Sequence, residues 1–223
     1  MAHLSSVIII AGGNATRFGS DKGLAMLGGK TIIERIYDSI ADISDGVVIV
    51  TSSEKQTKAY SEVLRDTVKY VPDEYNFQSP LVGVYSGLRS VDSANSLVLS
   101  CDVPFVSKEL ARMLLDLCLG KDAVIPRWPN AHIEPLQAAY DTKVALDASR
   151  LALKDGKRNM RAMIEGLTKI LYVSTTAIRA FDKELLTFFN INTRQDLDKA
   201  RRILGRLESY QQTSRPNSAN PRR

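Results

Sequence analysis

The first apolar run of the chain covers residues 7–11 and ends in two glycines, Gly12 and Gly13. It is rich in β-branched side chains, which is typical of a strand buried on both faces. Glycines at the end of such a strand let backbone N–H groups approach a ligand closely, because no Cβ stands in the way. The run therefore predicts an α/β fold with a phosphate- or nucleotide-binding loop at the edge of its sheet.

The loop after the glycines carries Arg17, Asp21 and Lys22. The arginine and the lysine place positive charge where a phosphate ligand carries negative charge. The loop does not match the dinucleotide fingerprint, and Leu24 stands where a Walker A loop ending in residues 29–31 requires its first glycine. For the two glycines alone, a tight turn is the alternative interpretation; for Arg17 and Lys22, it is solvated loop charge.

Strand and helix patterns alternate along the rest of the chain. Because such alternation favours parallel pairing, we expect a single domain over residues 1–209 with an open, mostly parallel sheet and helices on both faces. Pro135 argues against a central strand position in the segment 133–140, or for an edge strand. Residues 210–223 lack periodicity and core-forming side chains, which predicts a disordered basic tail. The expected strands are 46–51, 67–71, 97–101, 122–126 and 168–173, and the expected helices are 31–43, 54–65, 81–90, 107–117, 142–154, 158–167 and 194–208.

Composition excludes several classes of function. The chain has 223 residues, of which 44% are hydrophobic and 25% are charged, as in an ordinary globular protein. No stretch approaches the roughly 20 apolar residues of a membrane span, the N-terminus lacks a secretory pattern, and Cys101 and Cys118 form no metal or redox motif. We therefore expect a cytoplasmic protein with two reduced, buried thiols and no membrane contact. The net charge of +5 includes Arg215, Arg222 and Arg223 near the C-terminus, so it does not indicate a nucleic-acid partner.

Residues 11–22, Ala-Gly-Gly-Asn-Ala-Thr-Arg-Phe-Gly-Ser-Asp-Lys, resemble the signature loop of nucleotidyltransferases. They are most similar to the molybdenum cofactor guanylyltransferases, in which the Asp-Lys-Gly-Leu of residues 21–24 is typical. Three more segments extend the resemblance: 80–88, 134–140 and 190–193. The resemblance implies an enzyme that transfers GMP from GTP to the phosphate of the molybdopterin cofactor, releases pyrophosphate and uses Mg²⁺. It also implies transient contacts with molybdoenzymes or cofactor-synthesis proteins.

The resemblance further implies which residues form the site. Arg17, Lys22 and Asp102 would be catalytic, and Asp102, directly after the strand 97–101, would bind the metal ion. The implied nucleotide contacts are Ile10, Ala11, Gly12, Gly13, Lys22, Thr51, Asp73 and Asp102, and the implied acceptor contacts are Asn190, Asn192 and Arg158.

Several of these residues have a second interpretation. Asp102 and Asp73 also fit turn positions, and Asn192 also fits a helix cap, in competition with the neighbouring threonine. Arg158 also fits a solvated helix face. Thr51 stands where the family often carries asparagine, and its hydroxyl replaces one hydrogen bond of an amide but not two.

Two other functions compete with this interpretation. One is a related transferase that acts on cobinamide phosphate or makes the cytosine form of the molybdenum cofactor. The other is a cofactor-binding chaperone without catalysis, which would bind GTP and not turn it over.

Overall fold

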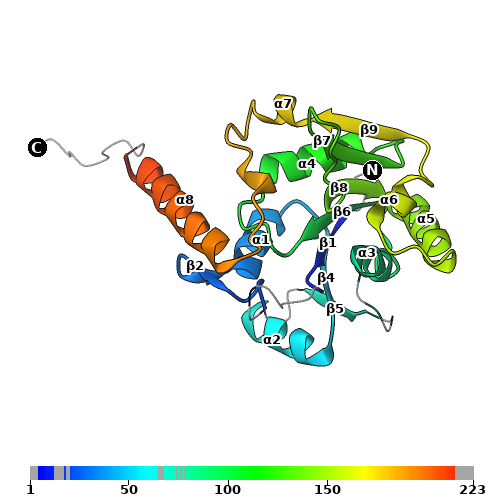
Figure 1. The fold of residues 1–223 in the computed structure, drawn as a ribbon, viewed down its shortest axis with the longest axis horizontal. Helices are drawn as coiled ribbons and strands as arrows, with labels where there is room; N and C mark the ends of the chain where they lie inside the picture. The colour runs from blue at the N-terminus through cyan, green and yellow to red at the C-terminus, as the bar shows by residue number, and fades with distance from the viewer. Residues whose placement is uncertain are drawn as a thin grey trace, which may run out of the picture.

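A seven-stranded sheet crosses the molecule in the order β5-β4-β1-β6-β8-β7-β9 (Figure 1). The computed structural model describes residues 5–12, 18, 21–64, 68–73, 75, 77 and 79–213, with backbone alone at 211–213. The strands are β1 (Ser5–Ile10), β4 (Gly46–Thr51), β5 (Lys69–Pro72), β6 (Asn95–Ser100), β7 (Ala123–Arg127), β8 (Gln137–Asp141) and β9 (Ile170–Ser174). A separate hairpin pairs β2 (Met26–Leu27) with β3 (Lys30–Thr31).

Helices cover both faces of the sheet, as predicted (Figure 1). They are α1 (Ile32–Ile40), α2 (Glu54–Leu64), α3 (Pro80–Leu88), α4 (Lys108–Leu117), α5 (Thr142–Lys154), α6 (Met160–Ile164), α7 (Thr175–Ile178), the 3-10 helix η3 (Leu186–Phe188) and α8 (Arg194–Thr213). In the part of the chain that the structure describes, none of them has the length and apolarity needed to cross a bilayer.

The central strand β1 explains why the first apolar run is so hydrophobic. Its side chains alternate between two cores, because successive residues of a strand point to opposite faces. Val7 and Ile9 pack with residues of α1, α4 and α8, whereas Ile8 and Ile10 pack with residues of α3, α5 and α6. All four are at most 5% exposed. β1 pairs in parallel with β4 on one side and with β6 on the other. Its carboxyl end therefore lies between the carboxyl ends of these two strands.

The strand β8 corrects the expectation for the segment 133–140. It is a central strand, antiparallel to both β6 and β7, and not an edge strand. Pro135 precedes β8 by two residues, so the missing N–H interrupts no hydrogen bond within the strand. The Pro135 carbonyl instead accepts a hydrogen bond of 2.7 Å from the Tyr140 hydroxyl. The sheet remains mostly parallel, with one reversed strand.

Helix ends follow the capping residues in the sequence. Thr31 begins α1 with the predicted capping box: its hydroxyl accepts from the Glu34 N–H at 3.3 Å, and the Glu34 carboxylate accepts from the Thr31 N–H at 2.6 Å. At the other end of the chain, α8 continues to Thr213, five residues beyond its predicted end. Residues 210–213 are therefore helical, contrary to the prediction of a tail from 210, and the rest of the predicted tail lies outside the described residues.

Two glycines allow α3 to lie directly on the sheet. A Cβ at Gly83 would stand 2.8 Å from the Ile10 side chain, and a Cβ at Gly87 would stand 2.3 Å from the Ile8 side chain. Both distances are shorter than real Cβ contacts, so the close packing predicted for this pair is confirmed. This contact packs α3 against β1 close to the carboxyl end of the strand.

Candidate nucleotide-binding site

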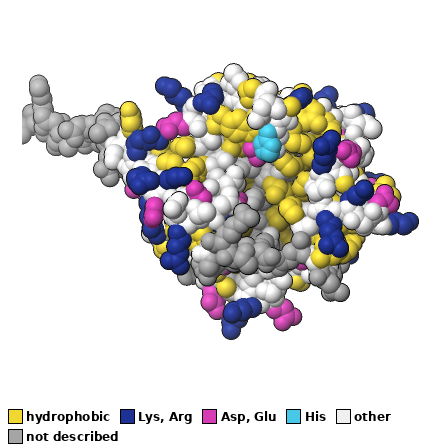
Figure 2. Space-filling view, viewed as in Figure 1, with side chains coloured by type: hydrophobic (Ala, Val, Ile, Leu, Met, Phe, Trp, Pro, Cys, Tyr) yellow, Lys and Arg dark blue, Asp and Glu magenta, His cyan; other side chains and the backbone are white. Residues whose placement is uncertain are grey.

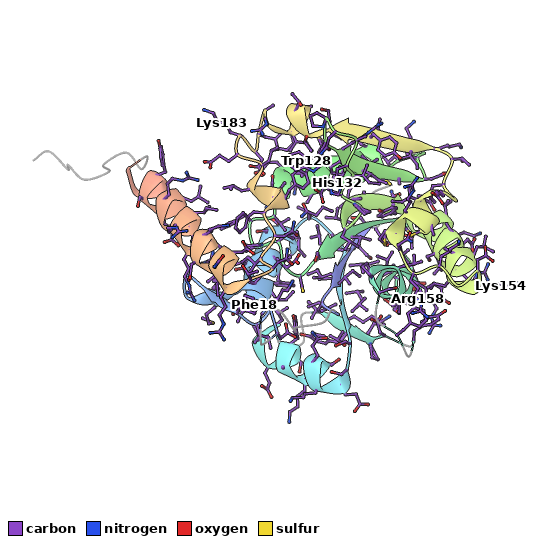
Figure 3. All side chains as sticks on the ribbon, in the orientation of Figure 1. Phe18, Trp128, His132, Lys154, Arg158 and Lys183 are labelled. Carbon is purple, nitrogen blue, oxygen red and sulfur yellow. The ribbon has the colours of Figure 1, made fainter. Side chains whose placement is uncertain are left out.

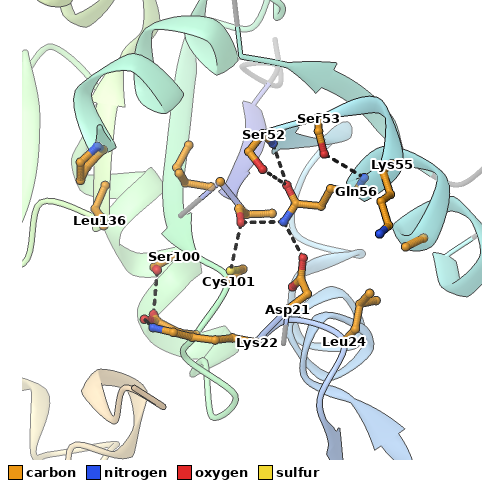
Figure 4. Close-up of a pocket in the computed structure, with 16 residues that line it drawn as sticks. Asp21, Lys22, Leu24, Ser52, Ser53, Lys55, Gln56, Ser100, Cys101 and Leu136 are labelled. Atoms are coloured by element: carbon orange, nitrogen blue, oxygen red, sulfur yellow. Dashed lines mark hydrogen bonds and ion pairs between the residues drawn. The ribbon is translucent and has the colours of Figure 1, made fainter. Parts of the chain in front are cut away.

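A cavity of about 530 Å³ lies at the carboxyl ends of β1, β4 and β6 (Figure 4). Ligands of open α/β sheets bind at this edge, between the loops that leave neighbouring strands. The space-filling view shows a hollow at the centre of one face, bordered by hydrophobic side chains, with His132 at its rim (Figures 2 and 3). The cavity is lined by Ile10, Ala11, Gly12, Asp21, Lys22, Leu24, Ser52, Ser53, Lys55, Gln56, Ala59, Pro80, Ser100, Cys101, Asp102 and Leu136.

Three segments that are distant in sequence meet around the Lys22 ammonium group. Its Nζ donates to the Asn192 Oδ1 at 2.8 Å and lies 3.5 Å from the Asp102 Oδ2. The other carboxylate oxygen of Asp102 accepts from the Ser100 hydroxyl at 2.7 Å. The Ile191 N–H donates to the Asp102 carbonyl at 2.9 Å, which holds the segment before α8 against the end of β6. The structure thus brings together three of the predicted site residues.

The alternative interpretation of Asn192 as a helix cap does not hold. The cap of α8 is Thr193, whose hydroxyl accepts from the Asp196 N–H at 3.2 Å. The Asp196 carboxylate in turn accepts from the Thr193 N–H at 3.0 Å. Because Thr193 supplies the cap, the Asn192 side chain is available to bond Lys22.

The oxygens around Lys22 form a donor set that suits Mg²⁺. A carboxylate oxygen of Asp102 and an amide oxygen of Asn192 face the same positive charge. Hard oxygen ligands of this kind, completed by phosphates and water, are what Mg²⁺ prefers. Within the described ranges, no group of three or more His, Cys, Asp or Glu side chains is placed to hold a metal ion. A magnesium site here therefore depends on oxygens from a bound phosphate ligand.

A second predicted contact, Asp73, lies against Gly12, which lines the cavity. A Cβ at Gly12 would stand 3.2 Å from the Asp73 Oδ2, so the carboxylate lies directly against the loop backbone. Burial raises the pKa of Asp73, and the nearby Ser86 hydroxyl opposes that shift in part. The Oδ1 of Asp73 is buried and has no hydrogen-bond partner among the residues described. A buried acceptor without a partner, next to a residue that lines the cavity, suits a ligand that donates hydrogen bonds.

Other predicted residues do not face the cavity. Thr51 is 0% exposed, and its hydroxyl is 2.6 Å from the Thr57 hydroxyl, so it does not offer that group to a nucleotide. Asn190 is exposed and donates to the Phe188 carbonyl at 3.1 Å. Arg158 is exposed in the segment after α5 (Figure 3), and its guanidinium lies 4.2 Å from the centre of the Phe77 ring. Gly13 and Arg17 lie outside the described residues.

Both cysteines are buried and free, as expected. Cys101 lines the cavity, but burial raises the pKa of its thiol far above neutral. Burial also raises the pKa of Cys118 to about 12. Since the thiolate is the nucleophilic form, neither cysteine acts as a nucleophile in this site.

The sequence did not single out several residues of the site. Ser52, Ser53, Gln56 and Ser100 line the cavity without belonging to any quoted motif. Gln56 lies on α2, whose first residues follow the end of β4 directly. This position near the start of α2 was the sequence signal that could have identified Gln56. A helix that follows a parallel strand starts at the edge of the sheet where ligands bind.

The fold and this site together define an α/β protein that binds a phosphorylated ligand at the carboxyl ends of parallel strands. The chain belongs to the MobA-like NTP transferase family, whose domain model matches residues 7–170. This membership confirms the resemblance that the loop and the three further segments indicated.

Relatives support the same assignment over most of the chain. A protein of Methanosarcina mazei named probable molybdenum cofactor guanylyltransferase is 34% identical, over 86% of this chain and 88% of its own length. The molybdenum cofactor guanylyltransferase of Desulfosudis oleivorans is 31% identical, over 86% of this chain and 92% of its own length. Among solved structures, molybdopterin-guanine dinucleotide biosynthesis protein A from Archaeoglobus fulgidus superposes with a TM-score of 0.77 at 32% identity, covering 90% of this chain and 99% of that one.

Proposed function

We propose that this protein transfers GMP from GTP to the phosphate of the molybdopterin cofactor, giving the guanine dinucleotide cofactor and pyrophosphate. The names of the relatives support this reaction. Within the molecule, the observation that carries the proposal is the meeting of Lys22, Asp102 and Asn192 at the end of the central strands. We further propose that the reaction takes place in the cytoplasm, with transient contacts to the proteins that make or receive the cofactor.

The residues of the site match what the reaction demands. The attacking group is a phosphate oxygen that is already anionic at neutral pH, so no side chain has to remove a proton from it. Charge neutralisation and in-line positioning remain to be supplied. Lys22 supplies positive charge at the α-phosphate and on the leaving pyrophosphate, and Asp102 and Asn192 orient its ammonium group. Arg17 is proposed to add a second positive charge from the same loop.

Asp102 is the proposed magnesium ligand, with the amide oxygen of Asn192 beside it. When bound, Mg²⁺ neutralises charge on the phosphate oxygens. The Ser100 hydroxyl donates to one oxygen of Asp102, which leaves the other oxygen facing the cavity side where Lys22 lies.

Asp73 is the proposed reader of guanine. The guanine edge presents an N–H and an NH₂ group as adjacent donors, and a carboxylate accepts two parallel hydrogen bonds. The unpartnered Oδ1 of Asp73 offers one of these two acceptor positions, and its Oδ2, which lies against Gly12, is proposed to offer the other. Backbone groups of Ile10, Ala11 and Gly12 line the same end of the cavity and are proposed to hold the nucleotide.

The proposal is tested by incubating the purified protein with Mg²⁺, molybdopterin cofactor and each nucleoside triphosphate in turn. We expect pyrophosphate and the dinucleotide cofactor with GTP, and neither product with CTP. Lys22→Ala and Asp102→Ala should each lower kcat by about 10²- to 10³-fold while the melting temperature stays close to the original. Lys58→Ala, at an exposed position of α2, is the matched control and should leave the rate unchanged.

Three outcomes would contradict parts of the proposal. GTP binding without turnover would favour a chaperone. Turnover with CTP, or with cobinamide phosphate as acceptor, would favour a related transferase. A full rate in either alanine variant would remove that residue from the mechanism.

A further inference from the structure

The carboxylate of Asp21, next to Lys22, is held by three hydrogen bonds. Its Oδ1 accepts from the Gly23 N–H at 3.0 Å and from the Tyr60 hydroxyl at 2.7 Å. Its Oδ2 accepts from the Gln56 Nε2 at 2.6 Å. Two of these three donors come from α2, outside the loop that carries Asp21.

The carboxamide of Gln56 uses all four of its hydrogen-bonding positions (Figure 4). Its Nε2 donates to Asp21 and, at 3.1 Å, to the Ala11 carbonyl. Its Oε1 accepts from the Ser52 N–H at 2.6 Å and from the Ser52 hydroxyl at 3.0 Å. A backbone N–H can only donate and a carbonyl can only accept, so the orientation of the amide is fixed. One side chain thus joins the end of β1, the end of β4 and the loop of Lys22.

Tyr60 stands one turn after Gln56 on the same face of α2. It is 0% exposed, and burial raises its pKa well above the usual value, so its hydroxyl remains a donor. A Cβ at Gly23 would stand 2.0 Å from this hydroxyl oxygen. The glycine that follows Asp21 and Lys22 therefore leaves the room that Tyr60 needs to reach Asp21.

We propose that Gln56 and Tyr60 are positioning residues, which hold Asp21 so that Lys22 points to Asp102 and the bound phosphates. This inference rests on the proposed function, because it assigns α2 a role in that reaction. The Lys22 side chain is bonded through its ammonium group, to Asp102 and Asn192, and the Lys22 backbone carbonyl accepts from the Ala25 N–H at 3.0 Å. On its N-terminal side, the backbone from which Lys22 projects is held by the three bonds to the Asp21 carboxylate, so a shift of Asp21 changes the direction in which the ammonium group points toward the α-phosphate.

Gln56→Glu is the sharpest test, because it replaces a donor by an acceptor with little change in shape. At neutral pH a second carboxylate then faces both Asp21 and the Ala11 carbonyl, and the repulsion displaces the loop. We expect kcat to fall by about tenfold or more, with a smaller change in the affinity for GTP. As the pH is lowered, the introduced glutamate takes up a proton and can again donate a hydrogen bond to Asp21. The ratio of variant to original kcat should therefore rise toward acid pH.

The groups that face Asp21 allow this pH profile to be interpreted. Within the described part of the chain they are Gln56, Tyr60, the Gly23 N–H and, through charge, Cys101, and the adjacent charged residue along the chain is Lys22. Burial raises the pKa of both Tyr60 and Cys101, so neither loses its proton in the acid range. The introduced glutamate is then the group whose charge distinguishes Gln56→Glu from the original protein.

Two further variants complete the experiment. Tyr60→Phe removes one hydrogen bond to Asp21 without adding charge, and it should lower kcat by about tenfold with no acid recovery. Glu62→Gln makes the reverse exchange at an exposed position of the same helix and should match the original at every pH. Calorimetric binding of GTP with Mg²⁺ is measured alongside kcat for each variant.

The outcomes separate this inference from the proposed function. If the original protein binds GTP but transfers nothing, the proposed function fails, and the pH dependence of GTP affinity in Gln56→Glu still tests the positioning role. If kcat is unchanged from that of the original protein in both Gln56→Glu and Tyr60→Phe, the inference is overturned. A kcat ratio for Gln56→Glu that stays constant with pH would overturn it as well. If Gln56→Glu does not fold, Tyr60→Phe decides through its kcat at unchanged melting temperature.

Discussion

Asp122 is an acid whose hydrogen bonds favour the folded state. One of its carboxylate oxygens accepts from the Thr168 N–H, the Thr168 hydroxyl and the Lys169 N–H at 2.7, 3.0 and 2.9 Å. These bonds lower the pKa of Asp122 below 3.8, so its contribution to stability is present above that pH and is lost as the pH falls through the lowered pKa. Asp122→Asn should lower the free energy of unfolding by about 1 kcal/mol at pH 7, with a difference that shrinks in acid. Urea denaturation at several pH values measures this, and a difference that is constant with pH would contradict it.

Asp73 carries the opposite shift and the opposite prediction. Burial raises its pKa above 3.8, so the charged form opposes folding once the pH exceeds the raised value. Asp73→Asn should therefore raise the free energy of unfolding at pH 7, and the gain should vanish as the pH falls below 3.8. If Asp73 reads guanine, the same variant binds GTP about tenfold more weakly. Stability that increases while GTP affinity is unchanged would confirm the burial argument and exclude the contact.

At the scale of elements, the contact between α3 and β1 is set by the absence of two side chains. Gly87 faces Ile8 on the central strand, whose Cγ2 would be 2.3 Å from an added Cβ. Gly205 on α8 offers a control, because a Cβ there would meet nothing within 4 Å. The two positions have the same residue type in the same kind of element and differ in their surroundings.

Alanine at these two glycines should change stability in opposite directions. Gly87→Ala forces α3 away from the sheet and should cost about 1–3 kcal/mol of unfolding free energy. Gly205→Ala removes conformational freedom from the unfolded chain and should add roughly 0.5–1 kcal/mol. Urea denaturation of both variants measures the difference. Equal effects at the two positions would mean that the α3 contact is looser than the distances indicate.

At the scale of the whole molecule, the sequence predicted what local patterns control. The capping box at Thr31, the buried central strand and the glycine pair of α3 are all encoded within about ten residues of the chain, and each was predicted correctly. The place of β8 was not, because its antiparallel insertion between β6 and β7 depends on pairing between distant segments. Pro135 suggested an edge, although the strand begins two residues later.

The residues of the candidate site also divide into those that local patterns predict and those that depend on contacts between distant segments. The loop of Gly12 and Lys22 and the acid at Asp102 were visible, because they follow the ends of apolar runs. The hydrogen bond from Gln56 to Asp21 joins positions 35 residues apart, and no local sequence pattern predicts it. Thr51 was misplaced for a related reason: its position at a strand end was read correctly, but the direction of its hydroxyl depends on Thr57 in the helix that follows.

The hydrogen bond between Lys22 and Asn192 spans 170 positions of the chain. Lys22 follows β1 and Asn192 precedes α8, so the contact between them forms late, because much of the intervening polypeptide must be in place first. A nascent or half-folded chain, even one with a complete glycine loop, therefore lacks the oriented ammonium group. Under the proposed function, transfer from GTP therefore requires that the segment containing Asn192 has been made and has folded against Lys22.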